Sequence, residues 1–192
     1  MRRIVIGISG ASGAVYGVRL LEVLAARSDA ETHLVVSDGA ATTIAYETGR
    51  DPAELARLAT QSYDVRDLSS SLASGTFRTV GMVIAPCSIG TLSRVANSAN
   101  DTLLARAADV HLKERRRLIL VVRETPLHAG HLRLMSEATA AGAVILPPVP
   151  GFYTRPQTIE ELVDHTVGKV LDLLGFDDHG LYERWRTPAP SP

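Results

Sequence analysis

Apolar residues recur along this chain in short continuous runs, and most of these runs are followed by a longer stretch with helical spacing. Short runs rich in β-branched residues are typical of strands that are buried on both faces of a sheet. We therefore expect strands at residues 4–8, 33–36, 82–85, 118–122 and 144–146. Strands that alternate with helices require crossover connections, so the pattern predicts an α/β fold: a mostly parallel sheet between two layers of helices, a three-layer sandwich.

Apolar positions three and four residues apart predict the helices. We expect helices at residues 15–27, from Ser37 through Glu47, and at 52–63, 102–116, 131–141 and 158–174. The serine-rich stretch 67–76 has no such period, so it predicts a surface loop, which is the best candidate for a lid.

Length and composition narrow the class of protein. The 192 residues and 45% hydrophobic content predict a single domain over residues 1–175, followed by an extension over 176–192 that packs on a neighbouring subunit. A formal net charge of −1 excludes the broad basic field of a nucleic-acid binder. The chain has one cysteine, no signal segment before the first strand and no apolar run long enough for a membrane helix, so we expect a cytoplasmic protein that inserts into no membrane.

Four predicted strands end in small, hydroxyl or charged residues. The first runs into the sequence SGASG, the second into Ser37-Asp38-Gly39, the third into a turn that contains Ser88-Ile89-Gly90-Thr91, and the fourth into Arg123-Glu124. Ligands of open α/β sheets bind outside the carboxyl ends of the strands. The four polar ends therefore predict one composite pocket, with Arg123 and Glu124 as its charged part.

The glycine-rich turn after the first strand has two readings. Gly7, Gly10 and Gly13 depart from the G-x-G-x-x-G spacing of dinucleotide folds. Small residues, serine hydroxyls and free N–H groups at a helix N-terminus suit a phosphate. A tight turn that packs the helix against the strand is the alternative, and both stay open. For Ser37 taken alone, capping of a helix is the better explanation.

Other polar residues carry weaker signals. Arg106 and Lys113 are seven residues apart, so they share a helix face that a second anion would contact; a solvated basic helix end is the alternative. Glu124 is either half of a structural ion pair or an acid/base group. Cys87 has no histidine near it in sequence and is expected to be a packing residue. The histidines show no metal-ligand spacing, so we expect no metal site.

Five strings, taken in order, closely resemble the UbiX-type flavin prenyltransferases: GISGASGAVYG, APCSIGTLSRVA, ARAADVHLKERR, VVRETPL and GAVILPPVPGFYTRPQTIEELVDHTVGKVLDLLG. The resemblance covers nearly the whole chain. It implies a flavodoxin-like (Rossmann-like) α/β fold assembled as a homododecamer, with FMN and dimethylallyl phosphate meeting where subunits join. It also implies that a dimethylallyl group is attached to N5 and C6 of reduced FMN without a metal. The resulting prenylated FMN would serve a partner decarboxylase of the UbiD type.

The resemblance also implies roles for particular residues. The positions that match the family's FMN site are Gly10, Ala11, Ser12, Ser37, Ser88, Ile89, Gly90, Thr91 and Arg123. Those that match the surroundings of dimethylallyl phosphate are Arg106, Lys113, Arg123, Tyr153 and Lys169, and Trp185 matches the family's C-terminal tryptophan. The expected catalytic residues are Glu124, Glu47 and Ser12.

Two positions depart from the family pattern. Lys169 replaces the arginine commonly found there, which exchanges a planar fork for a point charge. Asp38 stands where relatives often have lysine, so we expect less positive charge beside the flavin.

Two other functions are open. One is an FMN-dependent cysteine decarboxylase of the related superfamily, although no matching substrate clamp is evident and Arg106 within LLARAAD suits a phosphate. The other is a non-catalytic FMN-binding subunit of a decarboxylase complex.

Overall fold

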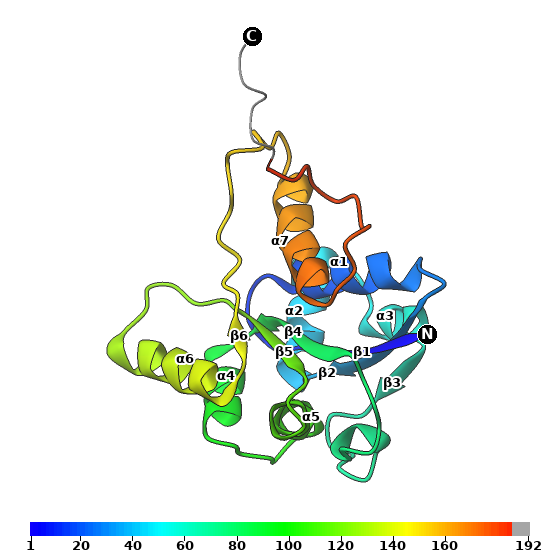
Figure 1. Ribbon diagram of the computed structural model, residues 1–192, viewed down its shortest axis with the longest axis vertical. Helices are drawn as coiled ribbons and strands as arrows, with labels where there is room; N and C mark the ends of the chain where they lie inside the picture. Colours follow the sequence, from blue (N-terminus) through cyan, green and yellow to red (C-terminus); the bar gives the residue numbers. More distant parts are fainter. Residues whose placement is uncertain (186–192) are drawn as a thin grey trace. The chain divides into compact units, whose positions relative to one another are not determined.

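One parallel sheet organises residues 1–148 (Figure 1). Its strands are β1 (Arg2–Ile8), β2 (Ala30–Val36), β3 (Gln61–Tyr63), β4 (Gly81–Cys87), β5 (Arg117–Val122) and β6 (Val144–Ile145). Their order across the sheet is β3-β2-β1-β4-β5-β6, and every pair is parallel. Without the short edge strand β3, this is the strand order of the flavodoxin fold. The predicted fold class is confirmed.

The computed structural model describes residues 1–185, and the chain divides into two units, Met1–Pro148 and Val149–Pro192, each of which is described by itself. The helices of the first unit are α1 (Ala14–Ala25), α2 (Asp38–Thr48), α3 (Pro52–Leu58), α4 (Ile89–Ala96), α5 (Leu103–Lys113) and α6 (Ala129–Ala141), together with a short 3-10 helix, η1 (Ser71–Ala73). The second unit contains α7 (Ile159–Leu173). The single domain over residues 1–175 stays a prediction, and residues 186–192 of the predicted extension lie outside the described residues.

Helices cover both faces of the sheet, which makes the three layers (Figure 1). The helix α1 packs on β1, β2 and β4 and contacts α2 and α3, whereas α5 packs on the sheet with α4 beside it and α6 beside α4. The strands β1, β4 and β5 are almost wholly apolar and buried, as expected for strands covered on both faces. Each fully buried leucine or isoleucine contributes about 1.5–3 kcal/mol through the hydrophobic effect.

Two glycines set the position of α1 over the sheet. A Cβ at Gly17 would lie 2.1 Å from the carbonyl oxygen of Ala85, so α1 can approach β4 this closely only because Gly17 has no side chain. Gly13 caps the helix with φ 100°, a conformation that side-chain-bearing residues rarely adopt. The tight-turn reading of the glycine-rich sequence is therefore confirmed at Gly13, whereas Gly17 lies within α1 and was not part of that prediction.

Two elements differ from the prediction. The helix predicted over residues 52–63 ends at Leu58, because Ala59 turns into extended backbone and Gln61–Tyr63 add a strand beside β2. The residues Ser88-Ile89-Gly90-Thr91, predicted as a turn, are the cap and first turn of α4, since the Ser88 side chain accepts a hydrogen bond from the Thr91 amide. The two elements that were missed, β3 with three residues and α4 with eight, are short, so each gives its period few repeats.

The serine-rich loop 67–76 is attached to the first unit. Leu72 is 3% exposed and belongs to the hydrophobic core. The guanidinium of Arg106 donates to the carbonyl oxygen of Ala73 at 3.2 Å, and that of Arg116 donates to the carbonyl oxygen of Gly75. These contacts hold the loop against α5 and the residues that follow it. The role of the loop as a lid stays a prediction.

Candidate active site

A pocket of about 420 Å³ opens at the carboxyl ends of β1, β2 and β4. Its volume lies within the range of small-molecule sites, roughly 300–1,000 Å³. Four residues predicted to bind FMN line it, namely Gly10, Ser37, Ser88 and Thr91. The composite pocket predicted from the polar strand ends is therefore present for three of the four strands.

The serine after β4 is held by a short hydrogen-bonded chain. The Ser9 hydroxyl donates to the carbonyl oxygen of Pro86 at 2.8 Å, and its oxygen accepts from the Ser88 amide at 2.8 Å. The Ser88 hydroxyl in turn donates to the hydroxyl oxygen of Thr91 at 3.1 Å. The end of β4 is thereby tied to the end of β1, which fixes the wall of the pocket.

Ser37 and Ser88 both begin a helix at this edge of the sheet. The Ser37 side chain accepts a hydrogen bond from the Ala40 amide at 3.2 Å, which confirms its predicted capping role. The amino ends of α2 and α4 therefore both open at the pocket, where their partial positive charge favours an anion.

The amino end of α1 already meets a carboxylate. Glu47, on α2, accepts hydrogen bonds from the amides of Gly13 and Ala14 at 2.8 and 2.9 Å. Burial alone would raise the pKa of Glu47, but hydrogen bonds from Ser12 and from the two amides, with the charge of Arg123, lower its pKa overall. These two amides therefore donate to Glu47, and the phosphate interpretation of this helix end stays a prediction.

Arg123 and Glu124 follow β5 as predicted. The Arg123 amide donates to the carbonyl oxygen of Cys87 at 3.1 Å, which places Arg123 beside the end of β4. Glu124 is exposed, and its carboxylate accepts from the amide of Thr125 at 2.9 Å. Through their shared interaction with Glu47, Ser12 and Arg123 form a second polar group next to the turn after β1.

Two ion pairs at the pocket were not predicted. Asp38 pairs with Arg66, and Arg94 pairs with Asp101 at 3.1 Å. All four residues line the pocket. The negative charge that Asp38 brings is therefore matched by Arg66. The sequence carries no periodic signal for this pairing, because Arg66 lies in the irregular segment after β3.

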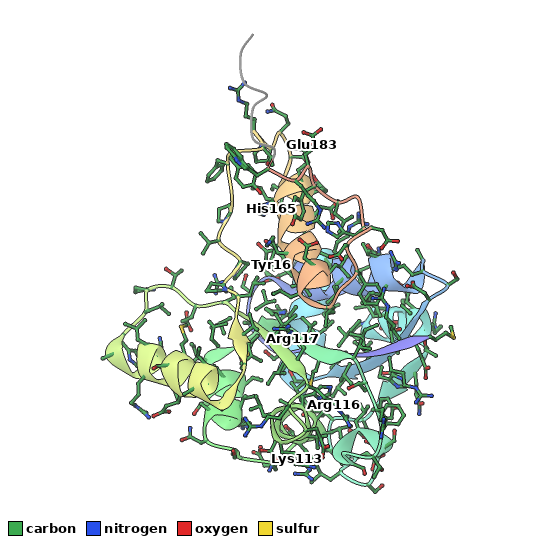
Figure 2. All side chains as sticks on the ribbon, in the orientation of Figure 1. Tyr16, Lys113, Arg116, Arg117, His165 and Glu183 are labelled. Carbon is green, nitrogen blue, oxygen red and sulfur yellow. The ribbon has the colours of Figure 1, made fainter. Side chains whose placement is uncertain are left out.

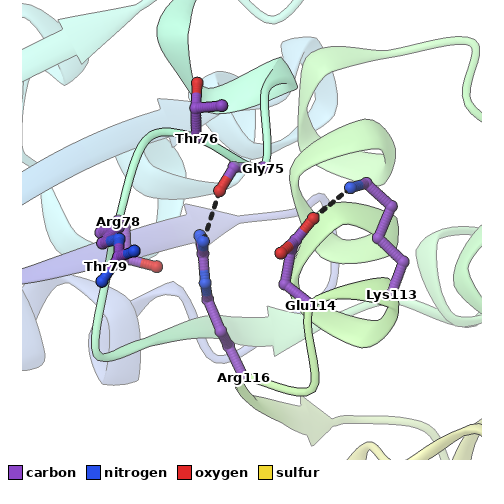
Figure 3. A pocket seen from close by; sticks show the side chains of 7 residues that line it. All are labelled: Gly75, Thr76, Arg78, Thr79, Lys113, Glu114 and Arg116. Atoms are coloured by element: carbon purple, nitrogen blue, oxygen red, sulfur yellow. Dashed lines mark hydrogen bonds and ion pairs between the residues drawn. The ribbon is translucent and has the colours of Figure 1, made fainter.

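Lys113 lies at the opposite edge of the sheet. It lines a second pocket of about 610 Å³ with Gly75, Thr76, Arg78, Thr79, Glu114 and Arg116 (Figure 3). Lys113 pairs with Glu114, while Arg106 donates to Asp109 at 2.9 Å. Lys113 precedes β5 and Arg123 follows it, so the length of this six-residue strand separates them by roughly 20 Å. The two cations on α5, Arg106 and Lys113, thus have separate acidic partners.

In the second unit, three predicted substrate residues accompany a histidine. The rings of Tyr153 and Trp185 lie edge to face, with centroids 5.6 Å apart. The Tyr153 hydroxyl is 3.0 Å from Nε2 of His165, which Figure 2 labels on α7. Burial, followed by the charge of Lys169, lowers the pKa of His165. His165 was not among the predicted site residues, although its spacing of four from Lys169 places both on one helix face.

Three further features of the described residues concern the cysteine, metal binding and membrane-spanning helices. Cys87 is buried, and burial raises the pKa of its thiol. Within residues 1–185, no group of three histidine, cysteine or acidic side chains is placed to hold a metal ion. None of the helices in that range combines the length and the apolar character that a membrane crossing requires.

The family model named Flavoprotein matches residues 1–171. The flavin prenyltransferase UbiX of Thauera aromatica is 58% identical over 183 residues, which are 95% of this chain and 93% of that protein. The chain belongs to the UbiX flavin prenyltransferase family. The suspected resemblance is thereby confirmed.

Solved structures agree with this membership. The crystal structure of AnUbiX in complex with FMN and dimethylallyl pyrophosphate shares 48% sequence identity, with a TM-score of 0.94 and coverage of 97% of this chain and 98% of that one. A dodecameric FMN-dependent UbiX-like decarboxylase from Escherichia coli O157:H7 shares 42% identity, with a TM-score of 0.93 and coverage of 96% and 100%.

The alternative of a cysteine decarboxylase is not favoured. The FMN-dependent cysteine decarboxylase TvaF is 16% identical, with a TM-score of 0.64 and coverage of 77% of this chain and 91% of that one. A likeness at this level of identity shows a shared fold and nothing about the reaction.

Proposed function

We propose that this flavin prenyltransferase joins the dimethylallyl group of dimethylallyl phosphate to N5 and C6 of reduced FMN. The observation that carries the proposal is the likeness, at a TM-score of 0.94, to a relative described in complex with FMN and dimethylallyl pyrophosphate. The finer choice of the monophosphate as substrate is part of the proposal.

The residues at the carboxyl edge of the sheet fit FMN. A pocket of about 420 Å³ there combines hydroxyls with two helix amino ends, and both suit a flavin's phosphate and polar groups. We assign FMN binding to Gly10, Ala11, Ser12, Ser37, Ser88, Ile89, Gly90, Thr91 and Arg123. Reduced FMN would supply the nucleophilic N5 and the C6 position.

Cationic side chains would carry the allyl phosphate. An allylic phosphate leaves readily only when its negative charge is met, and fixed cations meet it without a metal. We assign this role to Arg106, Lys113, Arg123 and Lys169, with Tyr153 as a further phosphate contact. Because roughly 20 Å separates Lys113 from Arg123 within one chain, one phosphate could contact both only if they came from different protomers. We therefore propose an oligomer of the kind described for the dodecameric relative.

The remaining chemistry concerns protons and water. The faces of Tyr153 and Trp185 would shield the allyl group from water and stabilise its developing positive charge. Glu124, which is exposed and follows β5, would move the protons that N5 alkylation and ring closure require. Glu47 and Ser12 stay the other two residues proposed for catalysis. Glu47, whose lowered pKa keeps it ionised near neutral pH, would also hold Ser12 and the amino end of α1 in place.

The family resemblance supports two further assignments. The product would be prenylated FMN, delivered to a UbiD-type decarboxylase, and the protein would act in the cytoplasm. A pull-down with candidate decarboxylases of the same cell would test the first.

Anaerobic incubation with reduced FMN and dimethylallyl phosphate tests the proposed reaction. Mass spectrometry of the released flavin should show a flavin that is heavier by one dimethylallyl group. The diphosphate, run in parallel, should react more slowly. Flavin binding without any mass change would instead support a non-catalytic FMN-binding subunit and would contradict the proposal.

A further inference from the structure

One face of α7 carries His165, Gly168, Lys169 and Asp172. The last three lie three, four and seven residues after His165, and these spacings place side chains on the same side of a helix. The chain after α7 returns along this face. A Cβ at Gly168 would lie 2.6 Å from the Tyr182 ring and 2.8 Å from Cε1 of His179. The tail can therefore lie directly on the helix only because residue 168 is a glycine.

Asp172 binds this returning tail at several points. Its side chain is 13% exposed. Its carboxylate accepts from the Tyr182 hydroxyl, from Nε2 of His179 at 3.2 Å and from Nη2 of Arg184. Nζ of Lys169 lies 3.7 Å away. One carboxylate thus holds three tail residues and one residue of its own helix.

The tail residue held last, Arg184, immediately precedes Trp185. Arg184 also donates to the carbonyl oxygen of Asp177 at 3.0 Å, so its position is fixed from two directions. The Trp185 ring meets Tyr153 edge to face, at an interplanar angle of 77°. Tyr153 in turn contacts α7 through His165. These contacts form a closed ring: Asp172 on α7 binds the tail at Arg184, Trp185 contacts Tyr153, and Tyr153 contacts α7 again through His165.

Tyr182 makes an additional connection across this ring of contacts. The rings of His165 and Tyr182 lie with centroids 4.8 Å apart, and those of His179 and Tyr182 lie 5.2 Å apart. Tyr182 therefore connects Asp172 to the histidine that contacts Tyr153. Burial would raise the pKa of Asp172, but hydrogen bonds from Tyr182 and Arg184 lower its pKa overall, which keeps the anchor ionised.

We propose that Asp172 is a positioning residue that anchors the C-terminal tail on α7 and thereby places Trp185 against Tyr153 for prenyl transfer. This inference rests on the proposed function, because Tyr153 and Trp185 are the aromatic residues assigned to the allyl group. Asp172 itself touches neither flavin nor allyl phosphate in this proposal. Its effect on turnover passes through the two rings and through its ion pair with Lys169.

The chain contains a single tryptophan, so tryptophan fluorescence reports on Trp185 alone. The experiment measures time-resolved anisotropy of the apoprotein and the kinetics of prenyl transfer in the same variants. Asp172→Asn removes the anchoring charge, and Tyr182→Phe removes one hydroxyl from the tail. Glu160→Gln is the matched control, because it removes an equal charge from an exposed side chain in the first turn of α7.

We expect Asp172→Asn and Tyr182→Phe to increase the fast depolarisation of Trp185 and to lower kcat/KM for dimethylallyl phosphate by about tenfold, since small misplacements of reacting groups cost this much or more. The Kd for FMN should stay unchanged, and Glu160→Gln should match the wild type. Unchanged depolarisation in both variants would overturn the anchoring role. Faster depolarisation with unchanged kcat/KM would overturn the positioning role. Absence of transfer by the wild type would refute the proposed function instead, and the anisotropy would still decide the anchoring.

Discussion

The Glu47 carboxylate accepts a hydrogen bond from the Gly13 amide at 2.8 Å, at the amino end of α1. This contact changes the expected use of the glycine-rich turn. A carboxylate already satisfies the helix end for which a phosphate was one of two open interpretations. We therefore propose that the flavin's phosphate binds at the amino ends of α2 and α4, which Ser37 and Ser88 cap beside the pocket.

Ser88→Ala should weaken FMN binding by about tenfold, because a hydrogen bond to a charged group contributes about 1.5–3 kcal/mol. Riboflavin, which lacks the phosphate, should bind the variant as it binds the wild type. Titration of flavin fluorescence measures both. Thr158→Ala, which removes the equivalent cap of α7, is the control for loss of a helix cap. If riboflavin binding fell as much as FMN binding, the phosphate would lie elsewhere.

Glu124→Gln should lose prenylated product and retain FMN, because the amide keeps the shape of the side chain but cannot accept a proton. The expected fall in kcat is about 10²–10⁴-fold, the usual contribution of general acid/base catalysis. Product flavin is measured by mass spectrometry after timed incubation. Glu137→Gln, which neutralises a carboxylate on α6 that pairs with Arg133, should leave kcat unchanged. Normal turnover of Glu124→Gln would remove this residue from the mechanism.

Lys169 should set the affinity for the allyl phosphate. Lys169→Ala should raise the KM for dimethylallyl phosphate by about tenfold, through loss of a charge-assisted hydrogen bond. Lys169→Arg should lower this KM, since a guanidinium binds phosphate through two parallel bonds. Steady-state rates at saturating FMN give both values. Arg133→Ala, an exposed cation on α6, is the control. Equal KM values for the wild type, Lys169→Ala and Lys169→Arg would contradict the assignment.

His111 should make the folded state sensitive to acid. Its Nδ1 donates to the Ala107 carbonyl oxygen and its Nε2 accepts from the Thr79 hydroxyl, both at 2.7 Å. Burial, with a smaller contribution from Arg116, lowers the pKa of His111 from 6.5 to about 4. Between these values the unfolded chain binds a proton that the folded chain does not, so the free energy of unfolding rises with pH across this window.

The stabilisation that comes from neutral His111 is complete above pH 6.5 and is lost as the pH falls toward about 4. The loss should be about 3 kcal/mol. Urea unfolding at the two ends of the window, at one protein concentration, measures it. His111→Gln should show a pH dependence that is smaller by this amount. An identical pH dependence in variant and wild type would show that His111 is not the group responsible.

Much of the fold could be predicted from local pattern. The central strands β1, β4 and β5 are continuous apolar runs, and their burial on both faces is the direct cause of that composition. The edge strand β3 could not be predicted, because Gln61 and Ser62 are exposed and have no apolar character to report. The helix α4 was missed although Ile89, Leu92 and Val95 follow one another at intervals of three residues, because eight residues give this period only about two turns.

The site was predictable only in part. Ser37 and Ser88 follow strands directly, so their position at the pocket follows from the topology. The pairing of Asp38 with Arg66 depends on an irregular segment that comes beside α2 only in the folded chain. The aromatic contact of Trp185 with Tyr153 depends on the tail returning along α7, which no local pattern encodes.

The most direct test of the proposed prenyl transfer compares the phosphate released with the flavin modified in a single incubation of the wild-type protein with reduced FMN and dimethylallyl phosphate. Inorganic phosphate and modified flavin are measured in the same sample. We expect one phosphate to be released for each flavin that gains a dimethylallyl group. Phosphate release without flavin modification, or recovery of both reactants unchanged, would contradict it.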